Sequence, residues 1–376
     1  MINMQNATKR YTVLLLSAPI GSGHKLAAEA LEQSLAQYAD VRVVHGNIFD
    51  FFPHFLGTAF LSTYLWVLKC CPWLYKLAYT WGNKKDGSLW LRTLLNKVLA
   101  YLGNSYLRNV NPDVVIATHA TPAGIIGYYK KKHPLWLAAV VTDFTIHRWW
   151  VCDGVDTYFI ADELLCKKID TKAEVKAFGI PVRQQFLHHD KKKCREKFGW
   201  DENERVCLLM GGGEGLLPMG KIISALKAAK IKNMRLLAVT GHNEKLAWKL
   251  RNQYGDSMEI YGFRDDIPQL MAGADMIITK AGGLTSAEVL ASGLELVIYK
   301  PLPGQEEGNA AFLHRHCGAF VAHDIQELVA YVRGEGPTAA QVQARKEHAH
   351  PLAAQKIAEY ILQVLQKQKS ACAKSQ

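Results

Sequence analysis

"YTVLLLSAPIGSGHKLAAEALEQSL" (residues 11–35) joins a strand, a glycine turn and a helix, and this order decides the fold class. Residues 11–16 are almost continuously apolar, as in a buried strand, and an Ala, Leu and Glu run with helical spacing follows the turn. The turn is not a complete nucleotide motif, because Leu26 stands at the third glycine of G-x-G-x-x-G and no G-K-[ST] ending is present. His24 instead follows Gly23 directly, which places a histidine at the mouth of the turn.

The same alternation of strand and helix continues in two blocks. Strands are expected at residues 13–17, 41–45, 114–118, 138–142 and 157–160, and then at 206–210, 236–240, 258–261, 276–279 and 295–299. This pattern predicts an α/β protein with two doubly wound, Rossmann-like domains that face a central cleft. We expect a first domain over residues 1–183, a second over 184–337, and a helical tail over 338–376 that packs back on the first. Ligands should lie at the carboxyl ends of the strands.

The composition is that of an ordinary globular protein and excludes a disordered chain. The 376 residues are 49% hydrophobic and 21% charged, and Lys plus Arg (45) exceed Asp plus Glu (34) by 11. Such a surplus of cations favours an anionic partner: nucleic acid, a nucleotide or lipid headgroups. The eight cysteines have no C-x-x-C spacing and residues 1–10 lack the apolar core of a signal peptide, so a reduced, cytoplasmic protein is expected.

One segment, residues 49–81, departs from the alternating pattern because it is dense in Phe, Trp, Tyr and Leu. Its uncharged run, 55–68, has 14 residues, which is fewer than the roughly 18–20 that a spanning helix needs. Residues 51–109 contain seven basic side chains and one acidic side chain, which favours contact with an anionic membrane surface through residues 49–109. A buried core helix or a subunit interface is the alternative. Nucleic acid is not expected as a partner, because no binding motif is present.

The second block carries two motifs suited to a nucleotide. "TKAGGLTSAEVLASG" (residues 279–293) places a glycine pair at a strand end and a helix directly after it, and backbone N–H groups in such a turn bind diphosphates. Glu288 has the carboxylate that accepts both hydroxyls of a ribose, and we expect it in the first helical turn. Its alternative role is that of a helix-dipole acid.

The second motif is "PLPGQEEGNAAFL" (residues 301–313). Gln305 and Asn309 are four residues apart at an expected helix start, so their amides face the same way. Together with Glu306 they have the chemistry to hold sugar hydroxyls, although a polar loop without a ligand would have a similar sequence.

These motifs resemble, in the same order, those of the diacylglycerol glycosyltransferases, a family that comprises plant monogalactosyldiacylglycerol synthases and bacterial processive diacylglycerol glucosyltransferases. The resemblance covers roughly residues 11–335 and is more distant to the peptidoglycan enzyme that adds N-acetylglucosamine to lipid I. The matching stretches are "SAPIGSGHKLAAEAL" (17–31), "VVTDFTIHRWW" (140–150), "FGIPVRQQF" (178–186), "GGGEG" (211–215), "YGFRDDIPQLMAGADMIITKAGGLTSAEVLASG" (261–293) and "PLPGQEEGN" (301–309).

The resemblance implies a GT-B fold, with a UDP-sugar in the second domain and a lipid acceptor in the first. It assigns the donor site to Gly212, Gly213, Phe263, Arg264, Gly282, Gly283, Leu284, Thr285, Glu288, Gln305, Glu306 and Asn309. Within this set, Phe263 and Arg264 would read uracil through their backbone, and Glu288 would bind ribose. The family places the diphosphate without a D-x-D metal site, so neither a metal nor another cofactor is expected.

The resemblance also makes His24 the candidate general base. A helix N-terminus disfavours the imidazolium form, which would keep the His24 ring neutral and able to accept a proton. Asp143 is the expected carboxylate that orients it. The acceptor site is assigned to Gly23, His119, His147 and Trp149, with a hydrogen-bonded loop histidine as the alternative for His119 and His147. Lys280 is expected to be a solvated strand-end lysine rather than a diphosphate partner.

The expected function is inverting transfer of a hexose from a UDP-sugar to diacylglycerol, by an enzyme attached peripherally to the cytoplasmic face of the membrane. Two alternatives remain from the sequence: a transferase that acts on another lipid-linked or soluble acceptor, and a non-catalytic UDP-sugar sensor.

Overall fold

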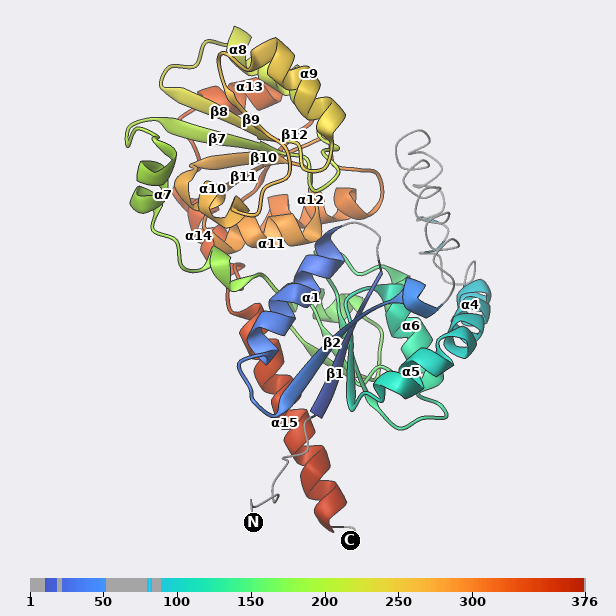
Figure 1. Ribbon diagram of the computed structural model, residues 1–376. Coiled ribbons are helices and arrows are strands. Elements are labelled where there is room, and N and C mark those ends of the chain that lie inside the picture. The colour runs from blue at the N-terminus through green and yellow to red at the C-terminus, as the bar shows by residue number, and fades with distance from the viewer. Residues whose placement is uncertain (1–10, 19–21, 52–79, 81, 83–88, 375–376) are drawn as a thin grey trace, which may run out of the picture.

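The computed structural model describes residues 11–18, 22–51, 80, 82 and 89–374, and these form two lobes (Figure 1). Each lobe is built on a six-stranded parallel sheet, so the predicted α/β fold with two parallel sheets is confirmed. Most of the segment expected to touch a membrane, residues 52–79, 81 and 83–88, lies outside the described residues. None of the helices within the described ranges is long and apolar enough to cross a bilayer.

The first lobe has the strand order β2-β1-β3-β4-β5-β6. Its strands are β1 (Tyr11–Ser17), β2 (Val41–Asn47), β3 (Val114–Ala117), β4 (Trp136–Val140), β5 (Thr157–Phe159) and β6 (Glu174–Lys176). Its helices include α1 (Ser22–Leu35), α4 (Leu89–Leu102), α5 (Asn104–Val110) and α6 (Ala120–Tyr129), with short 3-10 turns η1 (Ile48–Phe51), η2 (Arg148–Trp150), η3 (Glu163–Lys168) and η4 (Gln184–Phe186). All four residues of β3 are fully buried, because helices cover both faces of a parallel sheet.

The second lobe has the order β12-β11-β10-β7-β8-β9, which is the Rossmann order when its strands are counted from β7. Its strands are β7 (Arg205–Met210), β8 (Met234–Val239), β9 (Glu259–Tyr261), β10 (Met276–Thr279), β11 (Glu295–Tyr299) and β12 (Phe320–Ala322). Its helices are α7 (Lys191–Phe198), α8 (Met219–Ala228), α9 (Glu244–Tyr254), α10 (Ile267–Gly273), α11 (Gly283–Ala291), α12 (Gln305–His316) and α13 (Ile325–Arg333).

Both sheets have a point at which the strand order reverses, and these points position the site. In the first sheet, β1 pairs with β2 on one side and with β3 on the other. In the second sheet, β7 pairs in the same way with β8 and β10. Ligands of open α/β sheets bind at the carboxyl ends of the strands at such a point. The loops after β1, β3, β7 and β10 are therefore where a ligand is expected.

The chain crosses between the lobes twice. After the second lobe, α14 (Ala339–Glu347) contacts that lobe, and α15 (Ala353–Lys374) returns to the first, where Ile357 and Ile361 join the core under β1 (Figure 1). The return crossing is fixed by His348, whose Nδ1 is 2.6 Å from the carboxylate of buried Asp162. Burial alone would raise the pKa of Asp162, but the nearby imidazoles of His350 and His348 outweigh it and lower the pKa to about 2.

Candidate functional site

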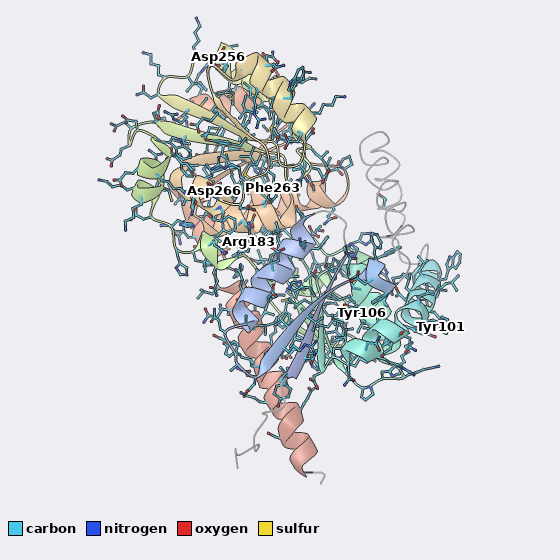
Figure 2. The ribbon with its side chains drawn as sticks, viewed as in Figure 1. Tyr101, Tyr106, Arg183, Asp256, Phe263 and Asp266 are labelled. Atoms are coloured by element: carbon cyan, nitrogen blue, oxygen red, sulfur yellow. The ribbon has the colours of Figure 1, made fainter. Side chains whose placement is uncertain are left out.

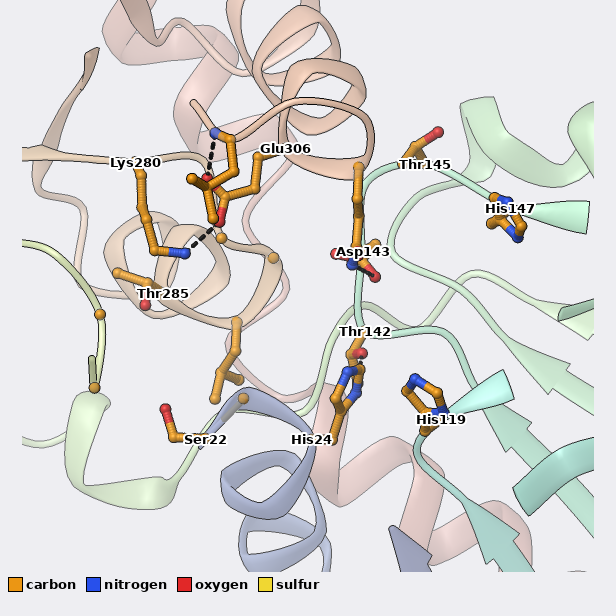
Figure 3. Close-up of a pocket in the computed structure, with 18 of the residues that line it drawn as sticks. Ser22, His24, His119, Thr142, Asp143, Thr145, His147, Lys280, Thr285 and Glu306 are labelled. Carbon is orange, nitrogen blue, oxygen red and sulfur yellow. Dashed lines mark hydrogen bonds and ion pairs between the residues drawn. The ribbon is translucent and has the colours of Figure 1, made fainter. Parts of the chain in front are cut away.

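A cavity of about 420 Å³ lies between the lobes, where the two reversal points face each other. Ser22 and His24 from the start of α1 line it on one side, and the glycine loop after β7 and the start of α11 line it on the other (Figure 3). Of the residues expected at the site, the following line this cavity: Gly23, His24, His119, Asp143, His147, Trp149, Gly212, Gly213, Gly282, Gly283, Leu284, Thr285, Glu288, Gln305 and Glu306.

His24 lies in the first turn of α1, with its ring against the strand ends of the first sheet. Its Nδ1 is 2.8 Å from the carbonyl oxygen of Thr118 and 2.9 Å from the hydroxyl oxygen of Thr142 (Figure 3). Because a carbonyl oxygen only accepts hydrogen bonds, Nδ1 carries the proton and donates it, which leaves Nε2 as the basic nitrogen. The loops after β3 and β4 thus select the tautomer that a general base requires.

Burial keeps the His24 ring neutral. It lowers the pKa of His24 from the ordinary value, while the charge of Asp143 and the hydrogen bond to the Thr118 carbonyl act in the opposite direction. The predicted direction is therefore confirmed, although loss of water is the main cause rather than the helix dipole. The His119 ring meets His24 edge-on, with ring centroids 4.7 Å apart, and burial followed by the neighbouring His24 lowers the pKa of His119 well below its ordinary value.

His119 and His147 each accept a hydrogen bond from a backbone N–H at a helix start. Nδ1 of His119 accepts from Thr121 at the start of α6, and Nδ1 of His147 accepts from Trp149 in η2. Both rings thus have the role of a hydrogen-bonded loop residue and also line the cavity. The two roles that the sequence left open are compatible.

Asp143 is buried, and its hydrogen bonds differ from those expected. The amide of Gln305 donates to one carboxylate oxygen, and the amide of Asn309 donates to the other at 3.0 Å. His24 is oriented instead by its hydrogen bonds to the Thr118 carbonyl, which accepts, and to the Thr142 hydroxyl, so Asp143 acts on His24 through its charge. Thr142 could not be singled out from sequence, because its role depends on a contact between residues 118 positions apart.

Asn309 does not line the cavity. It is fully buried, its Nδ2 also donates to the Ala281 carbonyl at 3.0 Å, and its Oδ1 accepts from the Phe144 N–H at 2.9 Å. Phe263 and Arg264 also lie outside the cavity lining. Phe263 is exposed after β9 (Figure 2), and Arg264 forms two hydrogen bonds with Asp266, at 2.6 and 2.5 Å.

Lys280 and Glu306 form an ion pair at the wall that belongs to the second lobe (Figure 3). The Lys280 side chain is only 17% exposed, so the expectation of a solvated lysine is wrong. Lys280 directly follows β10, and the first turn of α11 begins three residues later, with Thr285 also lining the cavity. A cation and the positive end of a helix therefore share one wall, which suits an anionic group.

Glu288 lines the cavity from the second turn of α11, one turn later than expected. It is 4% exposed, and burial raises its pKa to about 7, although the nearby guanidinium of Arg183 acts to lower it. Arg183 lies in the segment between the lobes, and its Nη2 is 3.2 Å from the Glu288 carboxylate (Figure 2). Sequence reasoning missed Arg183, and the only signal was its place in "FGIPVRQQF".

Solved structures with the same arrangement of two lobes include glycosyltransferases of the GT-B fold. MurG of Acinetobacter baumannii matches with a TM-score of 0.63 and 16% identity, covering 94% of this chain and 99% of that one. CalG4, the calicheamicin glycosyltransferase, matches with a TM-score of 0.63 and 12% identity, covering 95% and 98%. The fold and the cleft therefore define a GT-B protein.

The family follows from sequence. The Monogalactosyldiacylglycerol (MGDG) synthase family matches residues 24–182, and the Glycosyltransferase family 28 C-terminal domain matches residues 206–361. A processive diacylglycerol beta-glucosyltransferase of Bacillus cereus (strain G9842) is 30% identical over 336 residues, covering 86% of this chain and 84% of the relative. Its counterpart in Bacillus subtilis (strain 168) is 28% identical over 339 residues, covering 86% of each. The chain belongs to the diacylglycerol glycosyltransferase family and is a glycosyltransferase.

Proposed function

We propose that this chain transfers a hexose from a UDP-sugar to the hydroxyl of diacylglycerol, with inversion at the anomeric carbon. The observation that carries this proposal is His24: a neutral histidine with a fixed tautomer, in a cleft whose opposite wall is built for an anion. The names of the relatives supply the lipid acceptor and the glucosyl group.

The donor lies in the second lobe in this proposal. The first turn of α11 and Lys280 hold the diphosphate, and Glu288 accepts hydrogen bonds from the ribose hydroxyls. Uracil lies near Phe263, whose ring stacks on His242 with centroids 4.4 Å apart. The His242 N–H donates to the Gly213 carbonyl at 2.8 Å, which connects this stack to the glycine loop of the cavity.

The chemistry is a single displacement. Nε2 of His24 takes the proton from the acceptor hydroxyl, the hydroxyl oxygen forms a bond to the anomeric carbon, and the bond to UDP breaks on the opposite face. The imidazolium that forms is stabilised by the charge of Asp143 and by the acceptors on Nδ1. Negative charge that develops on UDP is stabilised by Lys280 and the α11 N-terminus, so we propose that the reaction proceeds without a metal or other cofactor.

In this proposal, the first lobe rests on the anionic cytoplasmic face of the membrane, and the lipid acceptor enters the cleft from there. Exposed apolar side chains follow one side of α4: Trp90, Leu94, Leu95, Val98, Tyr101 and Leu102, which are 43–82% exposed. Figure 2 labels Tyr101 among them. Spacings of three and four residues place most of them on one stripe, as in a helix that rests in a bilayer interface. On the opposite side, Arg92 donates to the Val151 carbonyl at 2.9 Å and so ties α4 to the segment that carries His147 and Trp149.

Product analysis tests the reaction. The purified protein is incubated with UDP-glucose or UDP-galactose and diacylglycerol in anionic vesicles, and we expect a glycolipid of inverted configuration from at least one donor. Loss of product in His24→Ala with UDP binding retained supports the catalytic role. If neither donor gives a glycolipid, the assignment of diacylglycerol as the acceptor is wrong. Binding of UDP-sugar without any transfer would favour a sensor.

Vesicle flotation tests the membrane surface with a matched pair of variants. Trp90 on α4 and Trp248 on α9 are 65% and 66% exposed, but Trp248 lies on the second lobe. We expect Trp90→Ser to weaken binding to anionic vesicles several-fold and Trp248→Ser to leave it unchanged. Equal effects of the two substitutions would contradict the assignment to α4.

A further inference from the structure

The loop that follows β4 leaves its own lobe and is held by the other. Asn309 of α12 accepts a hydrogen bond from the N–H of Phe144 and donates to the carboxylate of Asp143. Both N–H donors of the Asn309 amide are used, because the second goes to the Ala281 carbonyl. A fully buried amide in this state has no donor left for a substrate, so its function is to join the lobes.

Helix α12 holds this loop at more than one point. Gln305, one turn before Asn309, donates to the second carboxylate oxygen of Asp143. Gly308 lies between them, and a Cβ there would be 3.2 Å from the side chain of Thr145. The start of α11 also presses on the loop, because a Cβ on Gly283 would be 2.0 Å from the Thr142 carbonyl oxygen. The loop is thus seated on the first turns of two helices of the second lobe.

Thr142 connects the loop after β4 to the proposed general base, His24. It directly precedes Asp143, and its hydroxyl oxygen is 2.9 Å from Nδ1 of His24 (Figure 3). On the other side, Glu306 of the same α12 turn pairs with Lys280 in the proposed diphosphate site. A continuous set of contacts therefore runs from the donor wall through Asn309 and the loop to His24.

We propose that Asn309 and Thr142 are positioning residues, which align His24 for catalysis only while the two lobes are closed on each other. Asn309 fixes residues 143–144 on the second lobe, and the Thr142 hydroxyl then holds the His24 ring with Nε2 directed to the substrate. This proposal rests on the proposed function for the role of His24 as base, and it gives Asn309 a role other than donor binding.

Kinetics of paired variants test the proposal. Thr142→Val removes the hydroxyl at nearly constant shape, and we expect kcat to fall about 10- to 100-fold with the KM for UDP-glucose within about twofold. Thr142→Ser restores the hydroxyl and should recover most of the rate. Asn309→Ala should also lower kcat while the Kd for UDP stays within about twofold. The double variant Thr142→Val/Asn309→Ala should lose much less than the product of the two single effects, because both act on His24.

Nitrogen NMR of histidine-labelled protein gives a readout that needs no turnover. His24→Gln assigns the signal, and the wild type should show the Nδ1–H tautomer in one ring position. Because the Thr118 carbonyl still accepts from Nδ1, Thr142→Val and Asn309→Ala should keep this tautomer, but their His24 signals should shift and broaden as the ring loses its fixed position. Thermal unfolding confirms that the variants are folded, and Asn309→Asp, of equal size, replaces Asn309→Ala if that variant unfolds. A more than tenfold rise in the Kd for UDP in either Asn309 variant, with the His24 signal unchanged, would overturn the proposal, as would full activity of Thr142→Val.

The two proposals fail in different ways. If the wild type makes no glycolipid, the proposed function is wrong, and the NMR measurement still decides whether Asn309 controls the position of the His24 ring. If the wild type is active and its His24 signal does not respond to Asn309, only the positioning role is wrong.

Discussion

Gly283 offers the sharpest test of how closely the lobes must approach. A Cβ built on this residue would lie 2.0 Å from the carbonyl oxygen of Thr142 and 2.8 Å from a carboxylate oxygen of Asp143, whereas ordinary contact begins at 3.4 Å. Gly283→Ala therefore forces a separation of 3.4 − 2.0 = 1.4 Å. No side-chain rotation relieves it, because the nearest atom belongs to the backbone. The displaced loop carries Thr142 away from His24.

We expect Gly283→Ala to lower kcat about 100-fold, since a misplacement of about 1 Å at a catalytic group has an effect of this size. The assay is glycolipid formation from UDP-glucose and diacylglycerol vesicles. Gly220→Ala is the matched control, because a Cβ there meets only Leu250 at 3.9 Å and the residue lies in α8, away from the cleft. Activity of Gly283→Ala within about threefold of the wild type would refute the reasoning.

Further predictions concern ionisation and the donor wall. The acid limb of the pH profile of kcat/KM should have its midpoint below 6.5, because burial lowers the pKa of His24, and Asp143→Asn should move it to still lower pH by removing a charge that raises this pKa. Glu288 has its pKa raised from 4.5 to about 7, so the folded state binds the proton more tightly than the unfolded chain. Its contribution to the free energy of unfolding should fall by about 3 kcal/mol as the pH rises from 4 to 8, and urea titrations of Glu288→Gln should lack this decrease. Lys280→Met should raise the KM for UDP-glucose at least about tenfold, whereas EDTA should leave the wild-type rate unchanged; a rate abolished by EDTA and restored by Mg²⁺ would contradict the role given to Lys280.

The apolar periodicity of the sequence predicts most strands of both sheets. It does not predict two of the edge strands or the contacts between the lobes. Each strand expected from the sequence is present, with both ends within two residues of those expected, because apolar runs bounded by turn residues are strong signals. Two edge strands of three residues each, β6 and β12, were not predicted. The tail, expected to be helical, consists of the two helices α14 and α15.

The side chains that line the site could be predicted from the sequence, but the hydrogen bonds between them could not. His24 and the glycine pair were found because a turn motif is local in sequence. The roles of Asp143 and Asn309 were not, because they depend on hydrogen bonds between residues 166 positions apart. Arg183 was missed for the same reason, since its partner Glu288 is 105 positions away.

The two crossings between the lobes have a mechanical consequence. They lie side by side, because a Cβ on Gly179 of the first crossing would be 2.3 Å from the Cβ of His350 in the second. Two adjacent connections form a hinge. We therefore expect rotation about one axis to be the motion of one lobe against the other that needs the least free energy. We also expect product release to require a rotation of one lobe against the other about this axis.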